Sequence, residues 1–168
     1  QIVNIFGVHF QGEGVERSTQ TAISGWGIGA MNLSGSLIED VQNGMIASAV
    51  QHSIRNTSVQ KFNRNGILAY ADKDAFVRLE ADRPFNSSLS LRGTLIDGDD
   101  SGSTGLGVHG IRARVQQSVF RNLARAPERA LAGAITSVRS ALRVDDTSIT
   151  STAGPGIHAL ESLTWLTR

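Results

Sequence analysis

Residues 58–68 read SVQKFNRNGIL, and this stretch decides the fold of the chain. It joins a hydroxyl residue and an aliphatic residue to a glycine eight positions after the serine, and more aliphatic residues follow. The same sequence motif occupies residues 36–46 and 148–157, and the Asn-Gly pairs at Asn43 and Asn65 lie 22 positions apart. A unit this short cannot bury its own apolar face, so it must stack on copies of itself. The repeat therefore predicts a solenoid.

The rest of the chain fits the same motif when turns of variable length are allowed, because loops accept insertions at low cost. Residues 94–106 carry three extra positions, and residues 118–135 carry seven. A first repeat, which follows the motif less closely, begins around Phe10 and aligns with the motif again near Ile23. About six coils result.

Short runs of alternating apolar and polar residues predict the local structure. Apolar side chains such as Val59, Phe62 and Ile67 alternate with small or polar ones over a few residues only, which is the period of a strand. We expect strands at residues 2–6 and 163–166 as well. A coil of roughly 22 residues suits three short strands joined by three turns.

Residues 54–70 and 142–160, and less closely residues 33–50, resemble the right-handed parallel β-helices of the pectate-lyase-like superfamily, which are built from parallel β-helix repeats. The resemblance implies an all-β fold, a right-handed single-stranded parallel β-helix of about six coils, with residues 1–168 as a single module. Members of that fold include lyases, hydrolases, epimerases, phage tailspikes, adhesins and structural ectodomains. The function must therefore come from the site.

One insertion is expected to depart from strand structure. Arg121, Arg125 and Arg129 are spaced four apart, and Ala and Leu residues around them favour a short helix over residues 121–131. Such a helix would protrude from the prism, so these three arginines are the candidate partner-binding residues.

Composition limits the partners of the chain. Its formal net charge of +1 gives no overall attraction to nucleic acid, and no segment is apolar enough to span a membrane. The absence of cysteine excludes disulfides and thiolate metal sites. Four scattered histidines show no zinc-binding spacing, and the two tryptophans and one tyrosine, Trp26, Trp165 and Tyr70, are too sparse to predict an aromatic sugar-binding platform.

The two ends of the sequence carry no capping helix, and the first residue is Gln. Since solenoid ends expose core and strand edges, we expect the module to be a segment of a longer chain, with adjacent domains or subunits at both uncapped ends. Residues 3–10, VNIFGVHF, also resemble the β-helix repeats of fibrocystin-like surface ectodomains.

Three glycosylation sequons begin at Asn32, Asn56 and Asn86. Together they favour an extracellular or cell-surface glycoprotein. Asparagine also forms side-chain ladders at the turns of stacked coils, which is the competing interpretation.

The acidic turn at residues 97–102, DGDDSG, is the most chemically suggestive segment. Asp97, Asp99 and Ser101 match the first half of a calcium loop, but Val108 stands where the bidentate Glu belongs. The sequence therefore predicts no cofactor, with calcium at this turn as the alternative. A glycoside hydrolase would draw its acid and base from Asp97, Asp99 and Asp100, although their spacing from His109 is wrong for neighbouring coils.

Arginines dominate the C-terminal part of the chain. The formal net charge is −3 over residues 1–110 and +4 over residues 111–168, and the chain has fourteen arginines but two lysines. A basic flank that includes Arg112 and Arg114 could hold an acidic polysaccharide, or could serve a polysaccharide lyase with these two arginines in catalytic roles.

The sequence as a whole favours a non-enzymatic structural or adhesive module of a larger extracellular or cell-surface protein. It would act as a rigid spacer, a filament building block or a contact surface for protein or glycan. Two alternatives stay open: a lyase or hydrolase acting on acidic polysaccharide, and a segment of a phage tailspike or bacterial adhesin.

Overall fold

The computed structural model describes residues 1–12, 20–71, 86–124 and 133–168, and β-strand is the regular structure throughout these ranges. An 11-stranded sheet and a 6-stranded sheet are formed, and the strand pairs are parallel. The expected solenoid is confirmed at this level, since the architecture is consistent with a parallel β-helix. Among the described residues there is no helix long and apolar enough to cross a membrane.

The strands fall into three rows, one for each side of a coil. The first is the uncharged row, so named because its segments contain no Asp, Glu, Lys or Arg. It consists of residues 21–25 of β3 (Thr21–Ser34), residues 43–48 of β5 (Asn43–Arg55), β7 (Asn65–Tyr70), β10 (Thr104–His109), β13 (Gly133–Val138) and β16 (Ile157–Leu160).

The second is the arginine row, which carries most of the arginines that lie in strands. It consists of β1 (Ile2–Phe6), residues 28–34 of β3, residues 51–55 of β5, β8 (Ser88–Arg92), β11 (Arg112–Gln116), β14 (Ala141–Asp145) and β17 (Leu163–Thr167).

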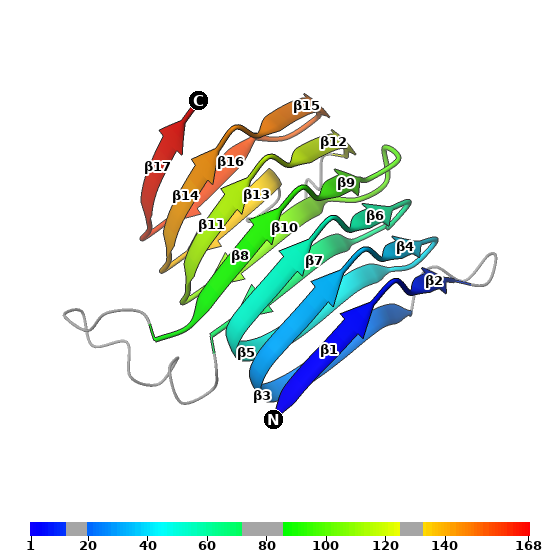
Figure 1. Ribbon diagram of the computed structural model, residues 1–168. Helices are drawn as coiled ribbons and strands as arrows, with labels where there is room; N and C mark the ends of the chain where they lie inside the picture. Colours follow the sequence, from blue (N-terminus) through cyan, green and yellow to red (C-terminus); the bar gives the residue numbers. More distant parts are fainter. Residues whose placement is uncertain (13–19, 72–85, 125–132) are drawn as a thin grey trace.

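The third is the short row, which forms the 6-stranded sheet: β2 (His9–Gln11), β4 (Leu37–Glu39), β6 (Ser58–Gln60), β9 (Leu95–Asp97), β12 (Val119–Leu123) and β15 (Ser148–Thr152). Figure 1 shows the coils stacked in sequence order, with the two chain ends at opposite ends of the stack. The expected strands at residues 2–6 and 163–166 are present as β1 and β17.

Side chains of equivalent residues stack in columns inside the prism, because the strand pairs keep their register from coil to coil. One column in the uncharged row and one in the short row form much of the core: Ile23, Met45, Ile67, Leu106 and Ile135, and Ile38, Val59, Ile96 and Phe120. Alternate residues point outward, so each row presents a surface of its own.

The corner between the arginine row and the short row explains the hydroxyl residue of the repeat. At these corners a residue with positive φ, for example Asn56 at 48° or Gln117 at 49°, precedes a Ser or Thr, except at the first corner, where Gly7 precedes Val8. That hydroxyl donates a hydrogen bond to the carbonyl two residues earlier, as Thr57 does to Arg55 at 3.0 Å. The same bond recurs at Ser36, Thr94, Ser118 and Thr147. The hydroxyl therefore closes the turn.

The register of the repeat differs by one residue from the alignment of serines. Leu37 pairs with Ser58 and Ile38 with Val59, a separation of 21, whereas Asn43 pairs with Asn65 at a separation of 22. Ser58 thus lies one position after the corner hydroxyl, which is Thr57. One extra residue in the turn after β6 restores the glycines to register.

The expected helix over residues 121–131 is wrong at its start. Arg121 continues strand β12 as far as Leu123, and its backbone pairs with Asp97 and Thr150 on the neighbouring strands. Strand pairing on both sides outweighs the helix propensity of the local sequence. Arg125 and Arg129 lie outside the described residues.

Candidate binding surface

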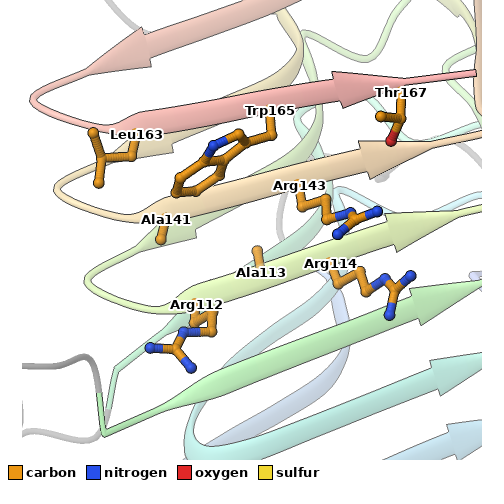
Figure 2. Close-up of a pocket in the computed structure, with 8 residues that line it drawn as sticks. All are labelled: Arg112, Ala113, Arg114, Ala141, Arg143, Leu163, Trp165 and Thr167. Atoms are coloured by element: carbon orange, nitrogen blue, oxygen red, sulfur yellow. The ribbon is translucent and has the colours of Figure 1, made fainter.

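A depression on the outer surface lies in the arginine row, across β11, β14 and β17. It is an open groove of about 620 Å³, and its lining includes Arg112, Arg114, Arg143, Leu163 and Trp165. We call this feature the arginine groove. Strand pairing places Ala141 between Arg112 and Leu163, and Arg143 between Arg114 and Trp165. The small side chain of Ala141 leaves space between its larger neighbours, and Figure 2 shows the indole of Trp165 between Leu163 and Arg143.

One carboxylate holds two of the groove arginines in place. Asp145 is nearly buried, and its oxygens lie 3.1 Å from Nη2 of Arg114 and 2.9 Å from Nε of Arg143. The Thr167 hydroxyl also donates a hydrogen bond to Asp145. Hydrogen bonds from Thr167 and then Arg143 lower the pKa of Asp145 to about 2, so it stays ionised.

Arg112 differs from the other two groove arginines. Within the described ranges it is exposed and makes no ion pair. Three guanidinium groups and one carboxylate leave the groove with a net positive charge, and the free guanidinium of Arg112 can form a bidentate contact with an anion.

The acidic turn does not join this groove. Asp97 lies in β9 of the short row, whereas Arg112 and Arg114 lie in β11 of the arginine row. Asp97 instead pairs with Arg121, with 2.7 Å between Oδ2 and Nε, and accepts a hydrogen bond from Asn122 at 3.0 Å. The structure therefore does not bring the candidate catalytic carboxylates and arginines together.

The acidic turn itself is a tight loop held by hydrogen bonds to Asp97 and from Ser101. Burial raises the pKa of Asp97, but hydrogen bonds from Asn122, Arg121 and the Asp99 amide outweigh it and lower the pKa. Asp99 and Asp100 are exposed, with φ of 50° and 55°. Ser101 donates to the carbonyls of Phe62 and Gly98, both at 3.1 Å. Nowhere in the described ranges do three or more His, Asp or Glu side chains gather as metal ligands.

Three aromatic side chains come together at the uncharged row: Tyr70 and His109 lie in it, and Trp26 lies next to it at the register shift of β3. This differs from the expectation that the aromatic residues are too sparse. Tyr70 stacks on Trp26, with 6.0 Å between ring centroids, and on His109, with 4.9 Å. The residues are 44 and 39 positions apart in the chain, and the coils make them neighbours. Trp165 lies elsewhere, in the arginine groove.

Burial lowers the pKa of two histidines, His109 and His52. His109 is partly covered in the aromatic stack, and desolvation lowers its pKa. His52 lies in the core of the arginine row, where desolvation lowers its pKa although the Ala47 and Ser88 carbonyls, each 3.3 Å from a ring nitrogen, act in the opposite direction. Both are therefore neutral near pH 7.

The sequon asparagines occupy three different positions. Asn32 lies in β3 and donates a hydrogen bond to Asn4 at 2.7 Å. Asn56 is exposed at a corner with φ of 48°. Asn86 is exposed two residues before β8. The side chains of Asn56 and Asn86 are thus accessible, whereas that of Asn32 is half-buried in an inter-strand pair.

Comparison with known proteins gives no match to a protein-family model, to a curated protein or to a solved structure. The site therefore has to be argued from its own geometry.

Proposed function

We propose that this chain is a right-handed parallel β-helix of six coils that acts as a non-enzymatic structural and adhesive module of a larger extracellular or cell-surface protein. Its contact surface is the arginine groove, and its partner is an acidic polysaccharide. The observation that supports this most directly is that one groove is lined by Trp165 and three arginines, of which Arg112 makes no ion pair within the described ranges. A right-handed turn is the strong preference of parallel β-strand connections.

The groove is a suitable contact surface because its side chains project from paired strands. β11 pairs with β8 and β14, and β14 pairs with β17 as well. The backbone of the groove is therefore already ordered, and little conformational entropy is lost when a ligand binds. Guanidinium groups bind carboxylate or sulfate in a bidentate manner, and an indole face packs against a sugar ring.

The groove as described is poorly equipped for acid–base catalysis. None of the described residues that line it carries a carboxylate, and Asp145, which pairs with two of its arginines, has a pKa of about 2 that makes it a weak base and an ineffective proton donor near neutral pH. A lyase remains the competing function, since Arg112 could contact a uronate carboxylate in either case.

The two ends of the arginine row are further contact candidates. β1 and β17 each pair on one side, and Ile2, Phe6, Leu163 and Leu166 are all more than half exposed. We propose that adjacent domains or subunits continue the rows at these edges, since added coils would cover apolar surface and pair the free backbone groups.

The test measures binding and turnover with polygalacturonate, alginate and hyaluronate. We expect calorimetric binding that weakens as salt rises, without formation of unsaturated or reducing-end products. Arg112→Gln should reduce affinity about tenfold, the loss of one charge-assisted contact. Arg139→Gln is the matched control, because Arg139 pairs with exposed Glu161 outside the groove. Equal binding by the Arg112 variant would exclude the groove, and turnover would establish the lyase or hydrolase instead.

A further inference from the structure

We propose that the outer face of the uncharged row is a second binding site, specific for a neutral saccharide. It is formed by Trp26, Tyr70 and His109, which we call the aromatic ladder, together with the adjoining groove on β7, β10 and β13. This site lies on a different side of the coil from the arginine groove and does not require that groove to bind anything.

The ladder exists because a small residue separates its first two rings. Tyr70 pairs with Ser48, whose buried hydroxyl is turned away to donate to the Ala71 carbonyl at 2.9 Å. Trp26 lies at the register shift of β3 between Gly25 and Ile28, and reaches over Ser48 to stack on Tyr70 with an interplanar angle of 29°. Although it stacks, Trp26 is 66% exposed, so most of the indole remains open to a ligand.

The adjoining groove, of about 280 Å³, continues the ladder toward later coils. Its outward column runs from Leu68 through Gly107 to Thr136, and a Cβ at Gly107 would lie 2.4 Å from Cδ2 of Leu68. The side chain of Leu68 therefore packs over Gly107 and lines the groove together with Tyr70 and His109. Polar groups at its margin include Arg64 and the hydroxyl of Thr136.

The charge of this surface favours a neutral ligand. The strand segments of the uncharged row contain no Asp, Glu, Lys or Arg, and Arg64 is the one charged residue among those that line the groove. Burial keeps the His109 ring neutral near pH 7. A polyanion is held by several cations at once, which this face does not offer. Aromatic rings beside a few uncharged hydrogen-bonding groups suit instead the apolar C–H faces and hydroxyls of a neutral sugar.

The chain offers a clean optical test because it contains two tryptophans, Trp26 and Trp165. In a Trp165→Phe variant, fluorescence reports on Trp26 alone. The probes are neutral hexasaccharides: cellohexaose, xylohexaose, mannohexaose and laminarihexaose. We expect at least one to change the fluorescence in a saturable manner, with an affinity that is insensitive to NaCl between about 0.05 and 0.5 M.

Calorimetry on Trp variants then assigns the site. Trp26→Ala should weaken binding of the same hexasaccharide about tenfold, which corresponds to about 1.4 kcal/mol, while Trp165→Ala leaves it unchanged. Tyr70→Ala should act in the same direction, and circular dichroism checks that each variant retains its sheet structure. The proposal fails if no neutral probe binds at about 10 mM, if Trp26→Ala binds like the parent, or if only acidic saccharides bind. Binding of acidic saccharides at Trp165 alone would support the arginine groove and reject the aromatic ladder.

Discussion

The side-chain amide of Asn65 donates a hydrogen bond to the side-chain oxygen of Asn43, 22 residues earlier in the chain, over 2.6 Å. Asn43 in turn donates to the hydroxyl of Thr21 at 3.2 Å. Both asparagines are almost fully buried, so each coil satisfies polar groups of the one below it. The Asn-Gly pairs of the sequence are thus an internal ladder at the start of the uncharged row.

Removing the side chain of Asn65 should destabilise the protein. Asn65→Ala leaves the buried Oδ1 of Asn43 without its donor, and we expect a loss of about 1–3 kcal/mol in the free energy of unfolding by urea denaturation. Asn4→Ala is the matched control, since it breaks the Asn32–Asn4 bond on the exposed surface and should cost within about 0.5 kcal/mol. Equal losses would contradict the role of burial.

Two buried serines should respond to alanine in opposite directions. Ser137 is fully buried, and its hydroxyl has no hydrogen-bond partner among the described residues. Ser137→Ala should raise stability by up to about 1 kcal/mol, because it removes a desolvated polar group.

Ser140 is the comparison for this experiment. It is equally buried, but its hydroxyl donates to the carbonyls of Val138 and Val108 and accepts from the Ile111 amide. Ser140→Ala should lower stability by about 1–3 kcal/mol. Thermal denaturation of the two variants beside the parent measures both effects, and a loss of stability in Ser137→Ala would show that its hydroxyl is satisfied.

The stacked glycines should not tolerate a methyl group. A Cβ at Gly66 would lie 2.6 Å from the Gly105 carbonyl oxygen and 3.0 Å from Cγ2 of Ile96. Since one of these contacts is with backbone, the coils would have to separate, and Gly66→Ala should cost about 1–3 kcal/mol. Gly154→Ala, which meets nothing within 4 Å, should be nearly neutral in the same urea titration.

Acid should weaken the arginine row through Asp145. Its pKa of about 2 in the folded state lies below the ordinary value of 3.8, so its contribution is complete well above pH 3.8 and is lost as pH falls toward 2. The melting temperature of Asp145→Asn should therefore fall less over this pH range than that of the parent. Asp146→Asn, which changes the exposed neighbouring residue, should follow the parent curve. Parallel curves for all three proteins would remove Asp145 as a source of acid sensitivity.

The fold was predictable because stacking requires the residues that the sequence repeats. Glycine at positions 44, 66 and 105 and the aliphatic residues after it are imposed by close contact between coils. The one-residue register difference at Ser58 was not predictable, because Ser occurs both at the corner and at the next position. The strand at Arg121 was missed because pairing with two neighbours leaves little signal in the local sequence.

The candidate site was predictable only in part. Arg112 was identified from the density of arginines, but the groove that it lines is completed by residues of two later coils, among them Trp165, 53 positions away. The sequence predicts that Trp26, Tyr70 and Trp165 are too sparse to form a platform, whereas the contact between Trp26 and Tyr70 depends on a register shift in β3 and a small residue at Ser48. Such contacts follow from the length of each turn, which the repeat does not specify.

The backbone hydrogen bonds between coils also determine how the molecule responds to force. They run along the stack, and the chain ends lie at its opposite ends, so tension applied between the ends pulls directly on these bonds. Each coil contacts mainly its two neighbours, and coils would therefore detach one after another from the loaded ends. A tether built in this way yields in many small steps and absorbs work gradually before the chain is fully extended.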